Sequence, residues 1–354
     1  MSDFYLILVV ILGLLAIADL MVGVSNDAVN FLNSAIGSKV VSFKTLMVIA
    51  SLGVAFGAIS SSGMMEVARK GIFNPEMFVF SEIMIIFMAV MITDILLLDV
   101  FNSYGLPTST TVSIVFELLG AAVVISLIKL SALDLSLVEL SDYINTSKAT
   151  QIIFGIFFSV IVAFSIGALI QFISRIILSF KFEEKAKWMG SLFGGIALTS
   201  IFYFIVIKGL KGTPYSENQY DILGGLSISN FIDINLTMIV LLSLLILTIL
   251  SYLFNSVFKL NIYTLIICVG TFALALAFAG NDLVNFIGVP IAGYESFLAW
   301  SASGVSAESF TMEILSEKVS APTFILLGAG IIMVLTLWTS SKAKSVIKTS
   351  IDLS

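Results

Sequence analysis

The chain contains no histidine and only one cysteine, Cys268, in 354 residues. The lack of histidine removes the side chain that most often binds metals and shuttles protons near neutral pH. A single cysteine cannot form a disulfide within the chain. Charged residues are also scarce, at 11% of the sequence, where a soluble protein has about a quarter. No basic run is present, which argues against a nucleic-acid partner.

Hydrophobic residues are abundant instead, at 59% of the chain with a mean hydropathy of +1.12. This composition predicts an all-α, multi-pass protein of the cell membrane, with lipid as its surroundings. A membrane-spanning helix needs about 20 apolar residues. Nine segments are long and apolar enough to be candidates: 4–25, 42–62, 77–101, 110–132, 151–179, 188–210, 235–256, 262–287 and 322–340.

One short polar phrase occurs twice within these apolar segments. The first copy runs from Ser25 to Phe31 and the second from Gly280 to Phe286, with five of the six positions from Asn to Phe identical. A lone Asn-Asp pair in a span is usually a hydrogen-bonding contact between helices. Two matching copies of Asn-Asp-x-x-Asn, here called the first and second signatures, indicate a transporter built from two related halves.

The number of segments between the signatures predicts how the halves are related. Seven steps separate the first segment from the eighth, so the two signature helices should run in opposite directions, as in an inverted repeat. The predicted organisation is a first repeat with its following helices (1–210), a polar loop between the halves (211–234) and the start of the second repeat (235–354).

A hydroxyl-rich stretch, Asn102–Thr111, interrupts the segments 77–101 and 110–132. Its Gly105 and Pro107 break the helix, and Thr108 or Ser109 is well placed to cap the next helix. Free amide N–H groups at a helix start favour an anion. We therefore expect a re-entrant helical hairpin with its tip around residues 102–113, because irregular backbone at membrane depth must line a cavity or be buried in protein.

Several carboxylates in the apolar segments have no basic residue near them in sequence. Asp19 and Asp27 precede the first lysine, Glu82, Asp94, Asp99 and Glu117 lie between Lys70 and Lys129, and Asp282 lies between Lys259 and Lys318. A buried carboxylate must be paired, protonated or bound to a cation. Na⁺ or a proton could neutralise these groups, and the hydroxyl-rich helix start could hold an anion. Together these features predict cation-coupled transport of an oxyanion.

These motifs resemble those of the inorganic phosphate transporter (PiT) family, the sodium/phosphate symporter type. The family's Gly-x-Asn-Asp-x-x-Asn signature is similar to Gly23–Asn30 and Ala279–Asn285, which both keep its Asn-Asp-x-x-Asn part, and its Gly-Leu-Pro-x-Ser-Thr-Thr-His motif is similar to residues 105–112. The histidine that ends this motif in the family is Val112 here. The resemblance covers residues 1–340 and implies an inverted-repeat transporter with a re-entrant hairpin that carries phosphate with Na⁺ by alternating access.

The resemblance also implies a ligand set, because it places the signatures and the hairpin at one site. The phosphate-binding residues would be Ser109, Thr110, Thr111, Asn30 and Asn285. The cation-binding residues would be Asn26, Asp27, Asn281 and Asp282, with Na⁺ held at Asp27 and Asp282. Na⁺ is then a co-transported ion, with no cofactor and no catalytic residue, and the protein is not an enzyme. A homodimer is possible.

Other functions remain open at the level of the sequence. An H⁺-coupled symporter of phosphate or another oxyanion could use Asp or Glu as the proton carrier. A membrane-embedded enzyme acting on phosphoryl or lipid groups is disfavoured, because there is no histidine and no cysteine in a polar setting. A passive channel or a scaffold would not accumulate phosphate against a gradient.

The second half carries no Pro-x-Ser-Thr-Thr motif of its own. Ser109 follows Asp27 by 82 residues, and the same spacing after Asp282 would fall beyond Ser354. The sequence therefore predicts an incomplete second repeat, which lacks a hairpin to match the first.

Overall fold

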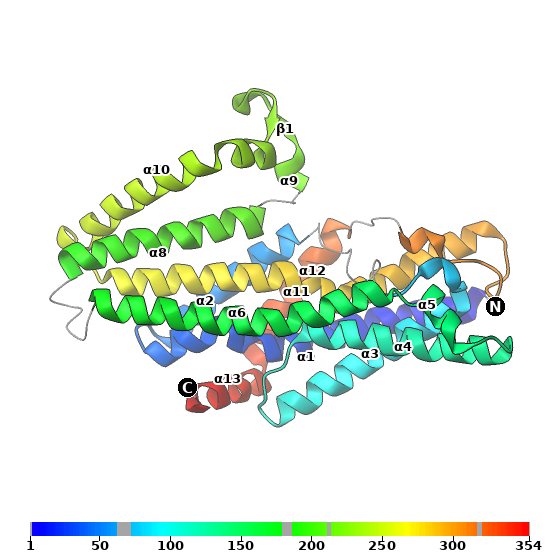
Figure 1. The fold of residues 1–354 in the computed structure, drawn as a ribbon. Coiled ribbons are helices and arrows are strands. Elements are labelled where there is room, and N and C mark those ends of the chain that lie inside the picture. Colours follow the sequence, from blue (N-terminus) through cyan, green and yellow to red (C-terminus); the bar gives the residue numbers. More distant parts are fainter. Residues whose placement is uncertain (1, 62–71, 179–185, 211–213, 317–320, 354) are drawn as a thin grey trace. The chain divides into compact units, whose positions relative to one another are not determined.

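The chain is almost entirely helical in its computed structural model, which describes residues 2–61, 72–178, 186–210, 214–316 and 321–353 (Figure 1). The α-helices are α1 (Ser2–Ser38), α2 (Phe43–Ser60), α3 (Phe80–Ser103), α4 (Thr110–Ala132), α5 (Leu140–Tyr143), α6 (Thr146–Leu178), α8 (Ser191–Phe204), α9 (Pro214–Glu217), α10 (Ile228–Ser256), α11 (Ile262–Ser303), α12 (Thr323–Thr339) and α13 (Ser341–Leu353). Short π-helical turns, Ala186–Gly190 and Ile205–Leu210, flank α8.

Among the described residues, eight helices are long and apolar enough to cross a membrane. A ninth candidate is the pair α12 and α13, which are bent by 65° at the break between them. All nine segments expected from the sequence fall on these helices, so the expected class of all-α, multi-pass membrane protein is confirmed.

Both signature helices continue well past the apolar segments that predicted them. The segment 4–25 belongs to α1, which ends at Ser38, and the segment 262–287 belongs to α11, which ends at Ser303. Pro290 lies inside α11 without ending it. A proline removes only one intrahelical hydrogen bond, and the residues around Pro290 are buried against neighbouring helices. Each signature therefore lies inside a continuous helix.

The described chain divides into two compact units. The first unit contains residues 1–33, 54–152 and 278–354, and the second contains residues 34–53 and 153–277. Each unit combines separate stretches of sequence, so neither coincides with a predicted half. The first unit holds both signatures and the α3–α4 hairpin, and every side chain of the candidate site belongs to it.

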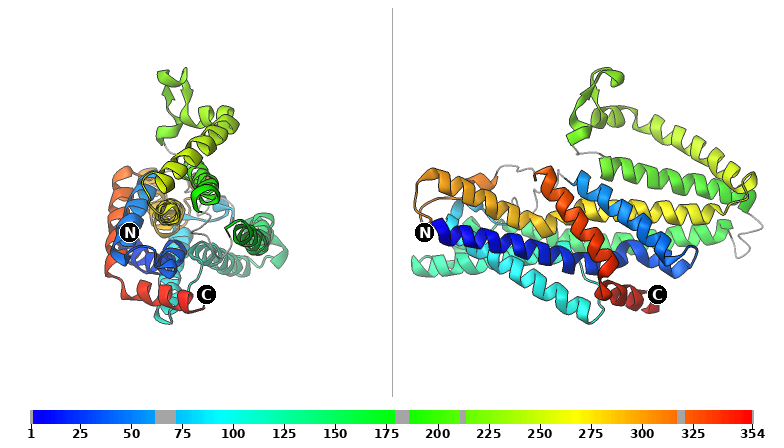
Figure 2. Two further views of the ribbon diagram at one scale, coloured as in Figure 1. Left: turned by 90° about the vertical axis from the view of Figure 1, so that its left-hand side faces the viewer. Right: turned by 180° about the vertical axis from the view of Figure 1, so that it is seen from behind.

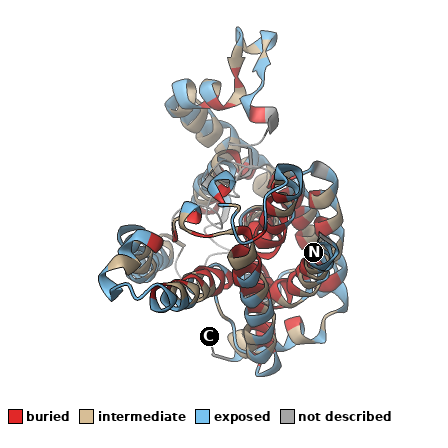
Figure 3. Ribbon diagram, turned by 90° about the vertical axis from the view of Figure 1, so that its right-hand side faces the viewer, coloured by how far each residue is buried: buried red, intermediate tan, exposed pale blue. Residues whose placement is uncertain are grey.

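The core of the first unit is built from large apolar residues of α1, α3, α4 and α11. The ring of Trp300 stacks on Phe80 at 4.6 Å between centroids, and Tyr5 packs edge-on against Trp300 at 5.0 Å. Figure 3 marks such buried positions in red. Close packing of these rings helps to hold the helices together at this end of the unit, since helices in a membrane associate through van der Waals contacts and hydrogen bonds.

Within the first unit, α1 and α11 run antiparallel (Figure 2). Tyr5 near the start of α1 contacts Trp300 near the end of α11. Phe31, farther along α1, contacts Phe278, which is earlier in α11, at 6.1 Å between ring centroids. Opposite directions are what an inverted repeat requires, and the repeat itself stays a prediction.

In the second unit, α8 and α10 pack closely against each other. A Cβ atom added at Gly195 would lie 1.9 Å from Thr248 Oγ1. The backbone of α8 therefore lies so close to α10 that position 195 has room only for a glycine. Of the expected polar loop, residues 211–213 lie outside the described residues. The remainder forms α9 and a hairpin of strands β1 (Gln219–Tyr220) and β2 (Leu226–Ser227), after which α10 begins.

Candidate functional site

The hairpin tip joins α3 to α4 through a short non-helical turn. Gly105 has a φ of +68°, a left-handed conformation that favours glycine. Ser109 is the N-cap of α4, and its hydroxyl accepts a hydrogen bond from the backbone N–H of Val112 at 3.3 Å. The cap expected at Thr108 or Ser109 is thus confirmed, at Ser109. The N–H groups of the first turn that remain have no carbonyl partner within the helix.

Asn26 of the first signature holds this tip against α1. Its Nδ2 donates to Asn102 Oδ1 at 2.7 Å and to the carbonyl oxygen of Leu106 at 3.1 Å. Its Oδ1 accepts from the backbone N–H of Thr108 at 2.8 Å. Asn102 in turn donates to the carbonyl oxygen of Val22 at 2.8 Å. Asn26 is fully buried, so its amide is used to fasten the hairpin.

The two signature aspartates face neighbouring threonines of the hairpin. The Thr110 hydroxyl donates to Asp27 Oδ2 at 3.3 Å, and the Thr111 hydroxyl donates to Asp282 Oδ1 at 3.4 Å. Asn285 donates to Thr111 Oγ1 at 2.8 Å and to Asp282 Oδ1 at 3.4 Å. Both carboxylates are buried, with 6% of Asp27 and 9% of Asp282 exposed. The start of α4 therefore connects α1 with α11.

A cavity of about 380 Å³ lies at this junction, within the range of small-ligand sites. Its lining contains Asp27, Asn30, Ser109, Thr110, Thr111 and Asp282, with Pro107, Thr108 and Phe278. The structure thus brings six of the nine predicted ligands to one cavity. Asn30 also donates to Asp27 Oδ1, at 3.5 Å.

The three remaining predicted ligands lie elsewhere. Asn285 contacts the site through Thr111 and Asp282, Asn26 is buried under the hairpin tip, and Asn281 has an exposed side chain. Neither Asn26 nor Asn281 belongs to the lining of the cavity. Their assignment as cation ligands stays a prediction.

The charge balance of the cavity is strongly acidic. Its lining residues include two aspartates and no lysine or arginine. Within the described part of the chain, no group of three or more His, Cys, Asp and Glu side chains could hold a metal ion. A cation here would therefore take the two carboxylates together with neutral amide or hydroxyl oxygens, a donor set that suits a hard ion such as Na⁺.

Two carboxylates that look unpaired in the sequence have basic partners in space. Glu82 forms an ion pair with Lys129 at 3.1 Å, and Asp99 forms one with Lys342 of α13 at 2.5 Å. The second pair joins residues 243 positions apart. Local sequence could not reveal it, because nothing in the pattern near Asp99 specifies that α13 returns to α3.

Two serines near the C-terminal end of the chain also contact the first signature helix. The Ser25 and Ser340 hydroxyls lie 2.7 Å apart, and Asn33 donates to Ser350 Oγ at 2.9 Å. Ser340 and Ser350 carry no motif, so sequence reasoning did not find them. They secure α1 to the break between α12 and α13 and to α13 itself.

Comparisons with known proteins identify the family and the fold of the chain. A protein of Thermococcus kodakarensis that is named provisionally as a phosphate permease is 26% identical over 320 residues, which cover 87% of this chain and 68% of that protein. The solved structure of a sodium-dependent phosphate transporter has a similar fold, with a TM-score of 0.63 and 17% identity, over 97% of this chain and 77% of that one. Residues 23–350 match the phosphate transporter family. The chain therefore belongs to the phosphate transporter family, and it is a membrane transport protein rather than an enzyme.

Proposed function

We propose that the protein carries inorganic phosphate across the cell membrane together with Na⁺, by alternating access to the cavity between the two signatures and the hairpin tip. The observation that carries this proposal is the pairing of Asp27 with Thr110 and of Asp282 with Thr111. These contacts place two buried carboxylates beside a hydroxyl-rich helix start in one cavity.

The phosphate side of the site is the first turn of α4. Free N–H groups and the positive end of the helix dipole stabilise an anion there. Ser109, Thr110 and Thr111 add hydroxyl donors that line the same cavity. Asn30 and Asn285 add amide donors at the facing helices. This set can bind a phosphate through neutral donors, without lysine or arginine.

The cation side follows from the two aspartates. A phosphate dianion beside two carboxylates would be strongly repelled at the short distances of a buried site. One Na⁺ bound at Asp27 and another at Asp282 would remove this repulsion, so that phosphate binding requires Na⁺. A small cavity of about 10 Å³, close to the space needed for one water molecule, is lined by both aspartates. The coupling thus arises from electrostatics, because phosphate is not stable in the site without Na⁺.

Radiolabelled phosphate uptake into proteoliposomes tests this function. An inward Na⁺ gradient should drive accumulation of phosphate, and replacement of Na⁺ by K⁺ or choline should abolish it. An inward proton gradient without Na⁺ should not substitute. Accumulation driven by protons alone would replace Na⁺ with H⁺ as the coupling ion, and equilibration without accumulation would indicate a passive channel.

A further inference from the structure

A second group of buried acids lies in the first unit, outside the phosphate cavity. Asp19 of α1, Asp94 of α3 and Glu117 of α4 come together, and we call them the carboxyl triad. Asp19 and Asp94 are fully buried, and Glu117 is partly buried. The charged groups that act on Asp19 include both Asp94 and Glu117. Three helices thus place one acid each at the same point.

Ser113 of α4 lies between two members of the triad. Its Oγ is 2.6 Å from Asp94 Oδ1 and 2.8 Å from Glu117 Oε1. A serine hydroxyl has a single proton, so it can donate to only one of these oxygens. The other short contact is a hydrogen bond only if that carboxyl group is protonated and donates to Ser113. The geometry therefore favours at least one proton on Asp94 or Glu117.

Asp19 gives an independent indication of the same kind. It is fully buried, and neither of its oxygens has a hydrogen-bond partner among the described residues. One oxygen of Asp94 and one of Glu117 are likewise buried without a partner. An ionised carboxylate in such surroundings would carry the full cost of desolvation. A proton shared between facing carboxyl groups removes that cost and supplies the missing donor.

The charged groups on the surrounding elements offer no other means of neutralisation. Asp27, also on α1, acts on Asp19, and Asp27 is acted on in turn by Asp94 and by Asp282 of α11. All of these groups are acidic. The basic residues on the packed helices α4 and α13 are Lys129, Lys342, Lys344 and Lys348. Lys129 and Lys342 are paired with acids outside the triad, and no described lysine is among the charged groups that act on Asp19, Asp94 or Glu117. No triple of acids in the described residues is arranged to hold a metal ion, which favours a proton as the ligand.

A groove between α3 and α4 gives access to the triad. Its volume is about 740 Å³, and its lining is mostly apolar but contains Glu117 and Ser113. The same groove reaches Ser109 and Thr108 at the hairpin tip, which also line the phosphate cavity. Glu117 is the least buried member of the triad, so a proton arriving through the groove meets it first. It can then pass through Ser113 to Asp94.

We propose that the carboxyl triad is a proton-binding site, separate from the phosphate cavity, whose occupancy holds the α3–α4 hairpin against α1. Loss of the protons would leave up to three negative charges on three packed helices. While the triad keeps its protons, the folded protein binds more protons than the unfolded chain at the same pH, so its stability should fall as pH rises. The hairpin carries Thr110 and Thr111, so phosphate uptake should also decline at alkaline pH, in parallel with this loss.

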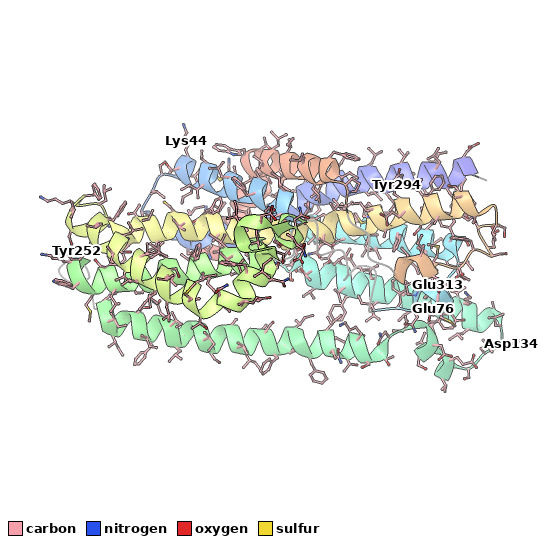
Figure 4. All side chains as sticks on the ribbon, turned by 90° about the horizontal axis from the view of Figure 1, so that it is seen from above. Lys44, Glu76, Asp134, Tyr252, Tyr294 and Glu313 are labelled. Atoms are coloured by element: carbon pink, nitrogen blue, oxygen red, sulfur yellow. The ribbon has the colours of Figure 1, made fainter. Side chains whose placement is uncertain are left out.

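Infrared spectroscopy of the purified protein tests the proposal without any transport measurement. The wild type should show the carbonyl stretching band of a neutral carboxyl group at mildly alkaline pH, where exposed acids are ionised. Asp94→Asn and Glu117→Gln should each reduce this band. The control is Glu76→Gln, which changes an exposed carboxylate, labelled in Figure 4, and should leave the band unchanged.

Thermal unfolding at a series of pH values gives the second measurement. Glu117→Gln keeps a neutral donor beside Ser113, so it should match the wild type at acidic pH and lose less stability as pH rises. The proposal is overturned if the band is absent or unaffected by both triad substitutions, or if the pH profiles of wild type and Glu117→Gln coincide. It is also overturned if Na⁺ removes the part of the band that Asp94→Asn and Glu117→Gln reduce, because the triad would then bind a metal cation. None of these outcomes depends on whether Na⁺ drives phosphate uptake.

Discussion

The two signatures share their sequence but not their surroundings. Asn26 is fully buried and holds the hairpin tip, whereas Asn281, at the matching position, is exposed. The last asparagine of each signature shows the opposite difference in burial. Asn30 of the first signature is exposed, whereas Asn285 of the second is 8% exposed and donates to Thr111. Among the polar residues that the signatures share, only the aspartates behave alike, each buried and each facing a threonine of α4.

The geometry of a helix start explains this pattern. Successive residues of an α-helix point about 100° apart, so Thr110 can reach α1 while Thr111 reaches α11. One hairpin tip in the described structure therefore serves both aspartates. It can cover only one of the two first asparagines, and it covers Asn26. Identical side chains thus take different roles according to which of them the hairpin contacts.

Substitution of either aspartate tests what the two signatures have in common, and it should have the largest effect. Asp27→Asn and Asp282→Asn remove the charge proposed to hold Na⁺ while keeping the shape of the side chain. Hydrogen bonds to a charged group are worth about 1.5–3 kcal/mol, so Na⁺-driven uptake should fall by roughly 10- to 150-fold. Asp134→Asn, at an exposed loop position labelled in Figure 4, is the control and should transport normally. Normal Na⁺ dependence in both signature variants would show that these acids do not bind the ion.

Substitution of the first asparagine of each signature, Asn26 or Asn281, tests the difference in burial between the two signatures. Asn26→Leu leaves Asn102, the Leu106 carbonyl and the Thr108 N–H without their partner. Each buried group left unsatisfied costs about 1–3 kcal/mol, so thermal unfolding in detergent should occur at a clearly lower temperature. Asn281→Leu changes an exposed side chain and should alter the free energy of unfolding by no more than about 0.5 kcal/mol. Equal destabilisation by the two substitutions would mean that Asn281 is also covered.

Two glycines test how tightly each signature helix is packed. A Cβ at Gly23 would lie 2.1 Å from the buried ring of Phe286, so Gly23→Ala must displace that ring. The expected cost is about 1–3 kcal/mol, measured by thermal unfolding. At Gly280 the nearest atom would be the Gly57 carbonyl oxygen at 3.6 Å, an ordinary contact. Gly280→Ala should be neutral or stabilising by up to about 1 kcal/mol, because alanine favours the helix. The comparison fails if Gly23→Ala is tolerated as well as Gly280→Ala.

The threonines give the finest test, since they are adjacent and serve different signatures. Thr111→Val removes contacts with both Asn285 and Asp282, whereas Thr110→Val removes only the contact with Asp27. A hydrogen bond contributes about 1 kcal/mol on average, so the concentration of phosphate for half-maximal uptake should rise about fivefold per lost bond. Thr111→Val should therefore weaken uptake more than Thr110→Val. Serine at either position keeps the hydroxyl and should restore most of the affinity.

The sequence alone predicted the features that depend on local chemistry. Nine apolar segments marked the helices, Gly105 and Pro107 marked the turn, and a cap was expected at Thr108 or Ser109, of which the structure uses Ser109. These predictions succeed because apolar length and helix breakers act within a few residues of chain. The ends of α1 and α11 were not predicted, since the signatures and Pro290 interrupt the apolar pattern without interrupting the backbone.

Only the tertiary structure decided which polar groups meet. The sequence placed aspartates, asparagines and threonines in apolar helices, and the cost of burying them required that each find a partner, a proton or a cation. It could not choose among these outcomes, because the partners lie far away along the chain. Packing brought Lys342 into contact with Asp99 and Asn102 into contact with Asn26. It also placed Thr110 and Thr111 beside the two aspartates. It also left Asp19, Asp94 and Glu117 facing one another, because the contacts of a side chain depend on how helices cross rather than on its neighbours in sequence.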